Sequence, residues 1–189
     1  MSDLAKQLQS FVAMVQTLDP TFGTGDTEAT PGRWYDAMVE LTSGYNEDPS
    51  EHLLVEFQCA DYDEMIVVGN IAVQSICEHH LLPFVGTATV AYIPDGGRIT
   101  GLSKIARCVR GYARRFQLQE RLTAQIANAI DARLSPKGVG VLVQCEHMCM
   151  TLRGVSEPGA VTTTSCLRGL LFEQDRARAE FLALARRPS

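Results

Sequence analysis

The order of the apolar and alternating segments along the chain constrains the fold more than any other feature of the sequence. Strands are predicted first, because three early segments are apolar, partly alternating and rich in β-branched residues: 53–59, 65–76 and 85–93. A helix capped by Ser103 is then predicted over 103–115, and a second has Leu122, Ile126, Ile130 and Leu134 at steps of four. Pro136 ends it, and short strands are expected at 139–145, 150–155 and 161–167 before a closing helix at 173–187. Strands, two helices and further strands indicate an α+β domain.

Two more helices are predicted ahead of this pattern. Residues 3–17 carry apolar side chains at helical spacing, and residues 19–30 are rich in Gly, Thr, Asp and Pro, as loops are. Thr30 can cap a helix that has Pro31 in its first turn and ends at Gly44. We therefore expect an N-terminal helical arm at residues 1–50 and a main domain at residues 51–189.

Composition excludes several classes of protein. The chain has 189 residues, of which 46% are hydrophobic, so wholesale disorder is excluded. No apolar run approaches the ~18 residues of a membrane helix, and the polar start shows no secretory signal. The net charge of -5 disfavours a general nucleic-acid binder. The six cysteines are expected to be thiols in a reducing compartment, most simply the cytoplasm.

Two clusters of cysteine and histidine predict a metal or catalytic site. Cys77 and His80 stand three apart and can reach one metal from a turn, whereas the adjacent His79 normally points elsewhere. In the second cluster, a strand would place Cys145, His147 and Cys149 on one face. Thiolate and imidazole favour zinc. Spacing alone leaves open a closed four-ligand structural site, an open catalytic site or simply buried thiols, and for Cys59, Cys108 and Cys166 we expect core residues.

A basic segment lies after the predicted strand at 85–93. Seven bases and only one acid lie between Arg98 and Arg121. Lys104 and Arg107 share a helical face near the positive helix N-terminus, where a polyanionic small molecule could bind, although a solvated helix face explains the charges equally well. Gln119 and Glu120 open the next helix. The acid there favours the helix dipole, and it could instead accept two N–H groups from a guanine edge.

Five linked motifs resemble the GTP cyclohydrolase I family in order and spacing. They are Ser75–Pro83, Gly101–Ile105, Gln119–Thr123, Glu146–Met150 and Thr162–Ser165. The resemblance spans roughly residues 64–182, and Thr30–Arg33 looks like the helix start of the family's arm. It implies the tunnelling fold, an antiparallel β-sheet backed by two antiparallel helices. It also implies a homodecamer of two stacked rings, with active sites at subunit interfaces.

The resemblance also implies a function for individual residues. Zinc would be held by Cys77, His80 and Cys149, with Fe²⁺ as an alternative metal. His79 and His147 would be the catalytic histidines. Gln119 and Glu120 would read the guanine base, with Glu78 nearby. Lys104, Arg107 and Arg153 would hold the triphosphate, and Ser103 would lie beside it. The expected reaction opens GTP at C8, giving 7,8-dihydroneopterin triphosphate and formate, for tetrahydrofolate, pterin or deazaguanine biosynthesis.

Two other functions are weighed against this one. A nitrile reductase of the same superfold would need a nucleophilic cysteine and a nicotinamide cofactor, and the paired Cys–His clusters speak against it. A zinc-stabilised binding or scaffold protein would have lost a catalytic histidine, yet both His79 and His147 are present. Neither a nucleic acid nor a membrane is expected as a partner.

Overall fold

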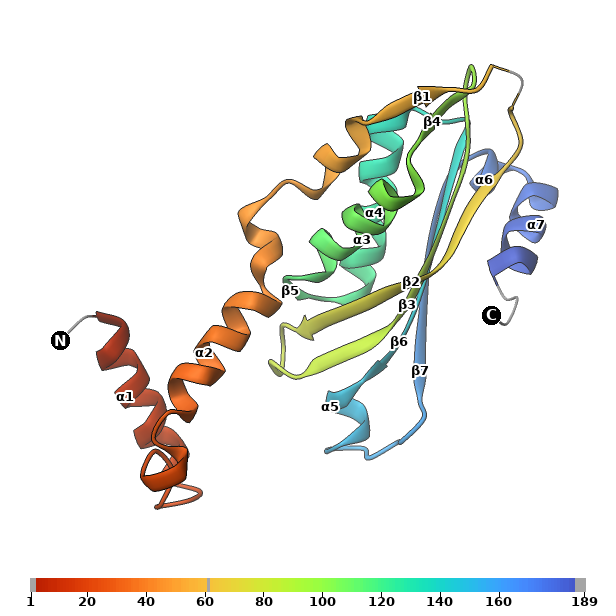
Figure 1. Ribbon diagram of the computed structural model, residues 1–189. Coiled ribbons are helices and arrows are strands. Elements are labelled where there is room, and N and C mark those ends of the chain that lie inside the picture. The colour runs from red at the N-terminus through yellow and green to blue at the C-terminus, as the bar shows by residue number, and fades with distance from the viewer. Residues whose placement is uncertain (1–2, 61, 186–189) are drawn as a thin grey trace. The chain divides into compact units, whose positions relative to one another are not determined.

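The computed structural model describes residues 3–60 and 62–185 (Figure 1). The chain divides into two compact units, Met1–Leu41 and Thr42–Ser189. No helix in the described residues has both the length and the apolar character needed to cross a membrane.

The first unit is a pair of helices joined by a turn-rich segment. Helix α1 spans Asp3–Val15, the short 3₁₀ helix η1 spans Gly25–Thr27, and α2 spans Thr30–Leu41. The ring of Phe11 stacks on Trp34 with centroids 4.6 Å apart and meets Phe22 edge-on at 6.1 Å. Both predicted helices are therefore confirmed. The second ends at Leu41 rather than Gly44, and the second unit opens with the 3₁₀ helix η2, Ser43–Asn46.

The second unit is built on a five-stranded sheet in the order β5-β2-β3-β6-β7. The strands are β2 Ile66–Cys77, β3 Pro83–Ile93, β5 Phe116–Gln117, β6 Gly138–His147 and β7 Val161–Gly169. Neighbouring strands are antiparallel except β5, which pairs with β2 in parallel. The expected strands at 65–76, 85–93, 139–145 and 161–167 are thus confirmed. The sheet is mixed rather than wholly antiparallel because a strand too short to be recognised by alternation joins its edge.

The strand predicted at residues 53–59 is wrong over its first half. The 3₁₀ helix η3, Pro49–Leu54, covers that part, and only β1, Glu56–Gln58, is a strand. Proline in the first turn and a side-chain cap from Asp48 to the Ser50 amide favour the helical turn over the strand. Strand β1 pairs with β4, Arg98–Thr100, in a separate two-stranded sheet.

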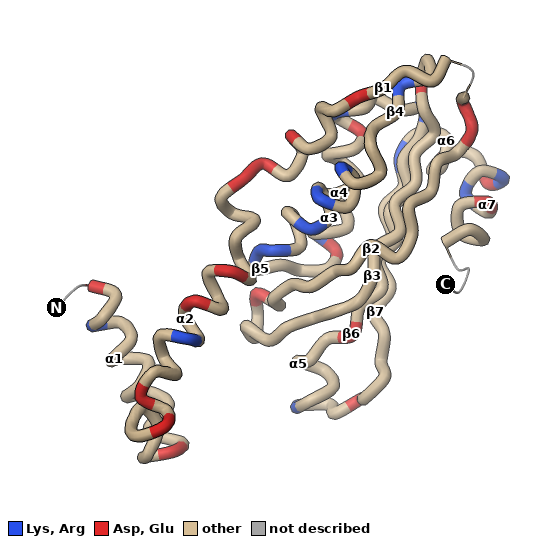
Figure 2. Tube along the Cα trace, in the orientation of Figure 1, with Lys and Arg blue, Asp and Glu red and all other residues tan. Residues whose placement is uncertain are grey.

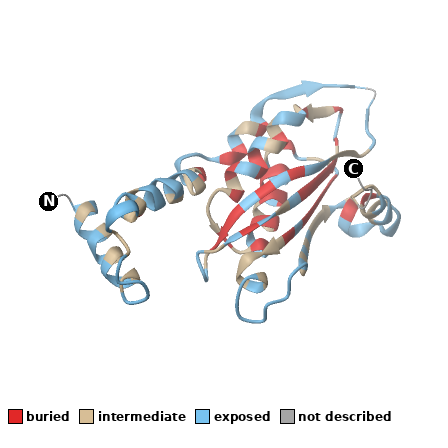
Figure 3. Ribbon diagram, turned by 60° about the horizontal axis from the view of Figure 1, so that its bottom comes forward, coloured by how far each residue is buried: buried red, intermediate tan, exposed pale blue. Residues whose placement is uncertain are grey.

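Two long helices cover one face of the large sheet. They are α3, Leu102–Ala113, and α4, Gln119–Leu134. Alternate residues of β3 and β6, such as Val90, Tyr92 and Val141, pack with residues of these helices in the main core. Buried residues, red in Figure 3, gather on the sheet and on the helices. The predicted Ser103 cap is wrong, because α3 begins one residue earlier, after Gly101, and has no side-chain cap.

The opposite face of the sheet carries a smaller core under two further helices. Helix α6 spans Leu170–Glu173 and α7 spans Asp175–Ala185. The closing helix predicted at 173–187 is confirmed as α7, α6 was not predicted, and residues 186–187 lie outside the described residues. Ala91, Leu142, Leu171 and Phe181 form this core. A side chain at Gly140 would come within 3.1 Å of the Phe181 ring, so the glycine makes room for it.

Candidate metal centre and active site

The turn after β2 places a thiol and an imidazole side by side. The amide of Leu81 donates to the carbonyl of Cys77 at 2.8 Å, and the amide of Cys77 donates to the carbonyl of Leu82 at 2.9 Å. Leu81 has a φ of 53°, a left-handed conformation that a leucine rarely adopts and that closes this turn. As a result, Nδ1 of His80 lies 3.7 Å from Sγ of Cys77.

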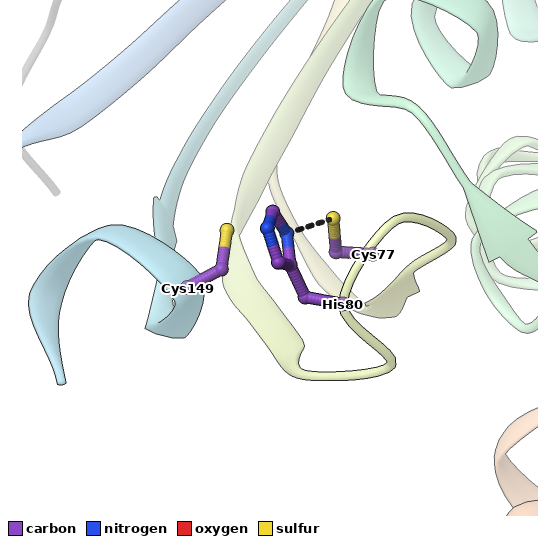
Figure 4. A group of neighbouring side chains, drawn as sticks. All are labelled: Cys77, His80 and Cys149. Carbon is purple, nitrogen blue, oxygen red and sulfur yellow. Dashed lines mark hydrogen bonds between the residues drawn. The ribbon is translucent and has the colours of Figure 1, made fainter. Parts of the chain in front are cut away.

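The third member of the group follows β6, whose last residue pairs with Phe84 at the same end of the sheet as Cys77. Strand β6 ends at His147, and Cys149 lies in the single helical turn α5, Met148–Thr151. The ligand atoms of Cys77, His80 and Cys149 all lie within 4.8 Å of one another (Figure 4). The strand predicted at residues 150–155 is therefore wrong, because the helical turn begins before it.

Strand alternation also fails to group the cysteines correctly. Because the backbone turns helical at Met148, Cys149 does not continue the face of Cys145. The Cys145 side chain is 1% exposed, and burial raises the pKa of its thiol to about 12. All six cysteines are free thiols, as expected, although Cys59 is exposed rather than part of the core.

The donor set of the group suits a soft or borderline divalent cation. Two thiols and one imidazole are the ligand types typical of zinc, and three of them leave a coordination position open. Burial, together with the neighbouring Cys77 thiol, raises the pKa of Cys149, because a second thiolate beside the first is unfavourable. A bound divalent cation removes that cost by stabilising both thiolates. The residues present therefore fit a metal ion.

A pocket of about 470 Å³ opens beside this group. Its lining includes the expected metal ligands and both expected catalytic histidines: Cys77, His79, His80, Gln117, Leu118, Gln119, Glu120, His147, Cys149, Met150 and Thr162. The rings of His79 and His80 stand at 86° to one another, so the adjacent histidines present different edges. The structure thus brings most of the sequence-predicted site residues into one pocket.

The short strand β5 explains why α4 begins at this pocket. Cys77 pairs with Gln117 in the parallel β2–β5 ladder, and the amide of Glu78 donates to the carbonyl of Gln117 at 3.1 Å. The next residues, Gln119 and Glu120, open α4. Glu120 is exposed at the pocket, whereas Gln119 is 1% exposed and is held inside the protein.

His147 is held between two neighbours. Its ring stacks on Phe84, its partner in the β3–β6 ladder, with centroids 4.6 Å apart and planes at 9°. Its Nε2 lies 2.8 Å from Oε1 of Gln119. Burial lowers the pKa of His147, and the nearby charge of Glu120 opposes that change.

Glu78 lies apart from this pocket. Its carboxylate forms an ion pair with the guanidinium of Arg121, and that pairing lowers the pKa of Glu78. The pair lines a separate pocket with Tyr45, Arg115 and Phe116.

The predicted phosphate-binding residues also lie outside the pocket. Ser103 and Arg107 are exposed and Lys104 is half-buried on α3, along which Lys and Arg gather in Figure 2. Arg107 lines a groove of about 340 Å³ with Arg110, Arg114 and His52. Arg153 follows α5, and its Nη1 donates to the carbonyl of Cys149 at 3.4 Å.

Sequence reasoning missed two contributors to the site. Phe84 gave no signal beyond its place in an alternating strand, and its role follows from the register that sets it opposite His147. Arg121 was counted only as one of seven bases, and its pairing with Glu78 depends on the unrecognised strand β5.

An α+β fold with a two-cysteine, one-histidine group at the end of its sheet defines a candidate metal-dependent enzyme. The sequence profile of GTP cyclohydrolase I matches residues 8–186, and the chain belongs to that family. A protein of Desulforamulus reducens named GTP cyclohydrolase 1 is 47% identical over 97% of this chain and 98% of its own. Proteins of the same name from Pelotomaculum thermopropionicum and Bacillus subtilis are 54% and 53% identical, over 83% and 81% of this chain and 83% and 80% of their own.

One solved structure gives a more distant likeness. The apo form of the archaeosine synthase QueF-Like has a TM-score of 0.44 and 20% identity, over 56% of this chain and 93% of that chain. This likeness is too weak to define the fold.

Proposed function

We propose that this protein hydrolyses GTP to 7,8-dihydroneopterin triphosphate and formate. The observation that carries the proposal is the convergence of Cys77, His80, Cys149, His79, His147 and Glu120 on one pocket in a member of this family. The fold would be the tunnelling fold, with residues 1–50 as its helical arm and residues 51–189 as its catalytic domain. The reaction would serve tetrahydrofolate, pterin or deazaguanine biosynthesis in the cytoplasm.

Zinc is the proposed metal, with Fe²⁺ as the alternative, and Cys77, His80 and Cys149 would hold it. A cation with three protein ligands and an open position polarises a bound water and lowers its pKa towards neutrality. The closeness of the three ligand atoms, all within 4.8 Å, supports this assignment.

Glu120 is the proposed reader of the guanine base. Its exposed carboxylate lies in the pocket, and a carboxylate can accept hydrogen bonds from both the N1–H and the 2-amino group of guanine. Gln119 and Glu78, which were expected to help, have their side chains engaged in contacts within the chain. Glu120 therefore carries most of the proposed base specificity.

His79 and His147 are the proposed acid–base groups. Hydrolysis at C8 requires a proton at N7 of the purine as water adds, and a second proton transfer as the ring opens to a formamide. An imidazole can donate and accept protons near neutral pH. Both rings lie in the pocket beside the metal ligands.

The triphosphate would be held by Lys104, Arg107 and Arg153, with Ser103 beside it. Lys104, Arg107 and Ser103 do not line the pocket of the metal ligands within one chain. This separation supports a homo-oligomer, a decamer in our proposal, in which α3 of one subunit completes the pocket of the next.

The test is incubation of the purified, metal-loaded protein with GTP. Formate release and the absorbance and fluorescence of a pterin should appear together. Formate without a pterin would limit the activity to ring opening. The absence of both in metal-replete protein would contradict the proposed function.

A further inference from the structure

The buried amide of Gln119 can be oriented in only one way. Its Nε2 lies 3.0 Å from the carbonyl oxygen of Val143 on β6 and 3.0 Å from that of Thr162 on β7. Carbonyl oxygens only accept hydrogen bonds, so the group facing them must be the amide nitrogen, which only donates. The reversed amide would bury an oxygen against two oxygens.

This orientation determines which nitrogen of His147 carries a hydrogen. With its nitrogen committed to the two strands, Gln119 presents Oε1 to Nε2 of His147 at 2.8 Å. An amide oxygen only accepts, so Nε2 of the histidine must donate. In the neutral ring the hydrogen is then on Nε2, and Nδ1 keeps a lone pair. Among the described residues, Nδ1 of His147 has no hydrogen-bond partner.

A second contact fixes the plane of the ring. Phe84 stacks on His147 with the planes only 9° apart, which leaves rotation within that plane to be set by a hydrogen bond. Gln119 is itself immobilised, because Nε2 also lies 3.1 Å from Oγ1 of Thr164 and the side chain is 1% exposed. The two contacts therefore define both the tilt and the rotation of the imidazole.

We propose that Gln119 is a positioning residue that selects the Nε2–H tautomer of His147 and fixes the rotation of its ring. The inference rests on the proposed function, because it assumes that His147 transfers a proton to or from the substrate. It assigns Gln119 a function other than reading guanine, since its amide is already engaged on both sides. Residues that orient a functional histidine through its second nitrogen typically change activity by about 10- to 100-fold when removed.

The kinetic test replaces Gln119 with methionine, which has a similar length and no hydrogen-bonding group. Gln119→Met should lower kcat for GTP by about 10- to 100-fold, while KM and metal content stay at their wild-type values. A direct contact with guanine would instead raise KM. The matched control is Gln125→Met, the same change on the same helix at an amide that accepts from Gln117 at 2.8 Å and does not contact His147. The control should turn over as wild type does.

The spectroscopic test does not depend on turnover. Solid-state ¹⁵N NMR of histidine-labelled, metal-loaded protein distinguishes the two tautomers, and the chain has only four histidines. At a pH well above the ordinary pKa of histidine, His147 should carry its hydrogen on Nε2 in wild type, and the share of the other tautomer should rise in Gln119→Met. The signal is assigned by its loss in His147→Asn.

The outcomes separate this inference from the proposed function. Wild-type protein that releases no formate but shows the Nε2–H tautomer contradicts the proposed function and leaves the tautomer assignment supported. An active wild type with the hydrogen on Nδ1 overturns the inference alone. If Gln119→Met fails to fold, Gln119→Glu is the second variant: with one oxygen protonated to donate to a strand carbonyl, its other oxygen still accepts from Nε2 and should preserve the tautomer. A wild-type kcat in either folded variant together with a changed tautomer would also overturn the inference.

Discussion

Arg121 and Glu78 form an ion pair that joins the first turn of α4 to the turn carrying His79 and His80. The same guanidinium donates Nε to Oε1 of Gln117 at 3.0 Å and Nη2 to the carbonyl of Phe116 at 2.9 Å. One side chain therefore links the edge strand β5, the helix α4 and the histidine turn. This link fixes the backbone next to Cys77, a proposed metal ligand.

Breaking this link should speed the loss of metal to a chelator. Arg121→Met and Glu78→Gln each remove the ion pair, so the turn that carries His80 is held less firmly. Because the two residues act through one contact, the double variant should lose metal no faster than the faster single variant. Chelator-driven release, followed by absorbance, measures the three rates. If the effects of the two changes add in the double variant, the residues act independently. If Glu78→Gln alone lowers the affinity for GTP, Glu78 binds the substrate.

Each of the three proposed ligands should be needed for metal binding. Cys77→Ser, His80→Ala and Cys149→Ser should each lose the metal, because two remaining ligands bind far more weakly than three. Cys166→Ser is the matched control, since that half-buried thiol lies outside the group. Elemental analysis of the purified variants measures their metal content. A full complement of metal in any of the first three would remove that residue from the site.

Much of the fold could be predicted because its long strands are apolar, partly alternating and rich in β-branched residues. In β3 and β6 one set of side chains faces α3 and α4 and the other faces α6 and α7, so both strands carry apolar runs long enough to be recognised. The errors fall where the elements are short. Strand β5 has two residues and α5 has four, and no periodicity can develop over such lengths.

The candidate site, too, could be predicted only in part from the sequence. The spacing of Cys77 and His80 was informative because a turn brings residues three apart together. The second cluster was less informative, since alternation placed Cys145, His147 and Cys149 on one face and only the resemblance left Cys145 out of the metal site. Contacts between distant segments, such as Phe84 with His147 or Arg121 with Glu78, depend on strand register and could not be read from spacing.

Acid should weaken the link between η3 and α4 through Asp48. Hydrogen bonds from the Ser50 hydroxyl and amide, with the Arg133 charge nearby, lower the pKa of Asp48. A folded pKa below the unfolded one stabilises the folded state above about pH 3.9, and this contribution is lost as the pH falls through the folded value. The melting temperature of wild type should exceed that of Asp48→Asn by a constant amount near neutrality. The difference should shrink in acid, and a difference that grows there would reverse the sign of the shift.

Base and phosphate recognition should separate in two variants. Glu120→Gln turns one of two acceptors into a donor facing a donor, so GTP and guanosine should both bind more weakly, by about 1–3 kcal/mol. Lys104→Ala should weaken GTP far more than guanosine, because its proposed target is the phosphate chain. Calorimetry with both ligands measures each loss. Unchanged binding of GTP to Glu120→Gln would exclude the carboxylate from base recognition.

The last prediction separates the catalytic histidines from the metal ligands. His147 lies two residues before Cys149, yet it is outside the three-residue group and its Nε2 is bound to Gln119. His147→Ala should therefore keep its metal and lose about 10²- to 10⁴-fold in formate release, the usual scale for a positioned acid or base. His147→Asn serves as a second variant, because alanine leaves a space beside Phe84 and an unpaired acceptor on Gln119. Metal content and formate release are measured on the same preparation, with His80→Ala as the control that should lose both. Metal-free His147 variants would make this residue a ligand, and metal-replete variants with near-normal release would remove it from the reaction.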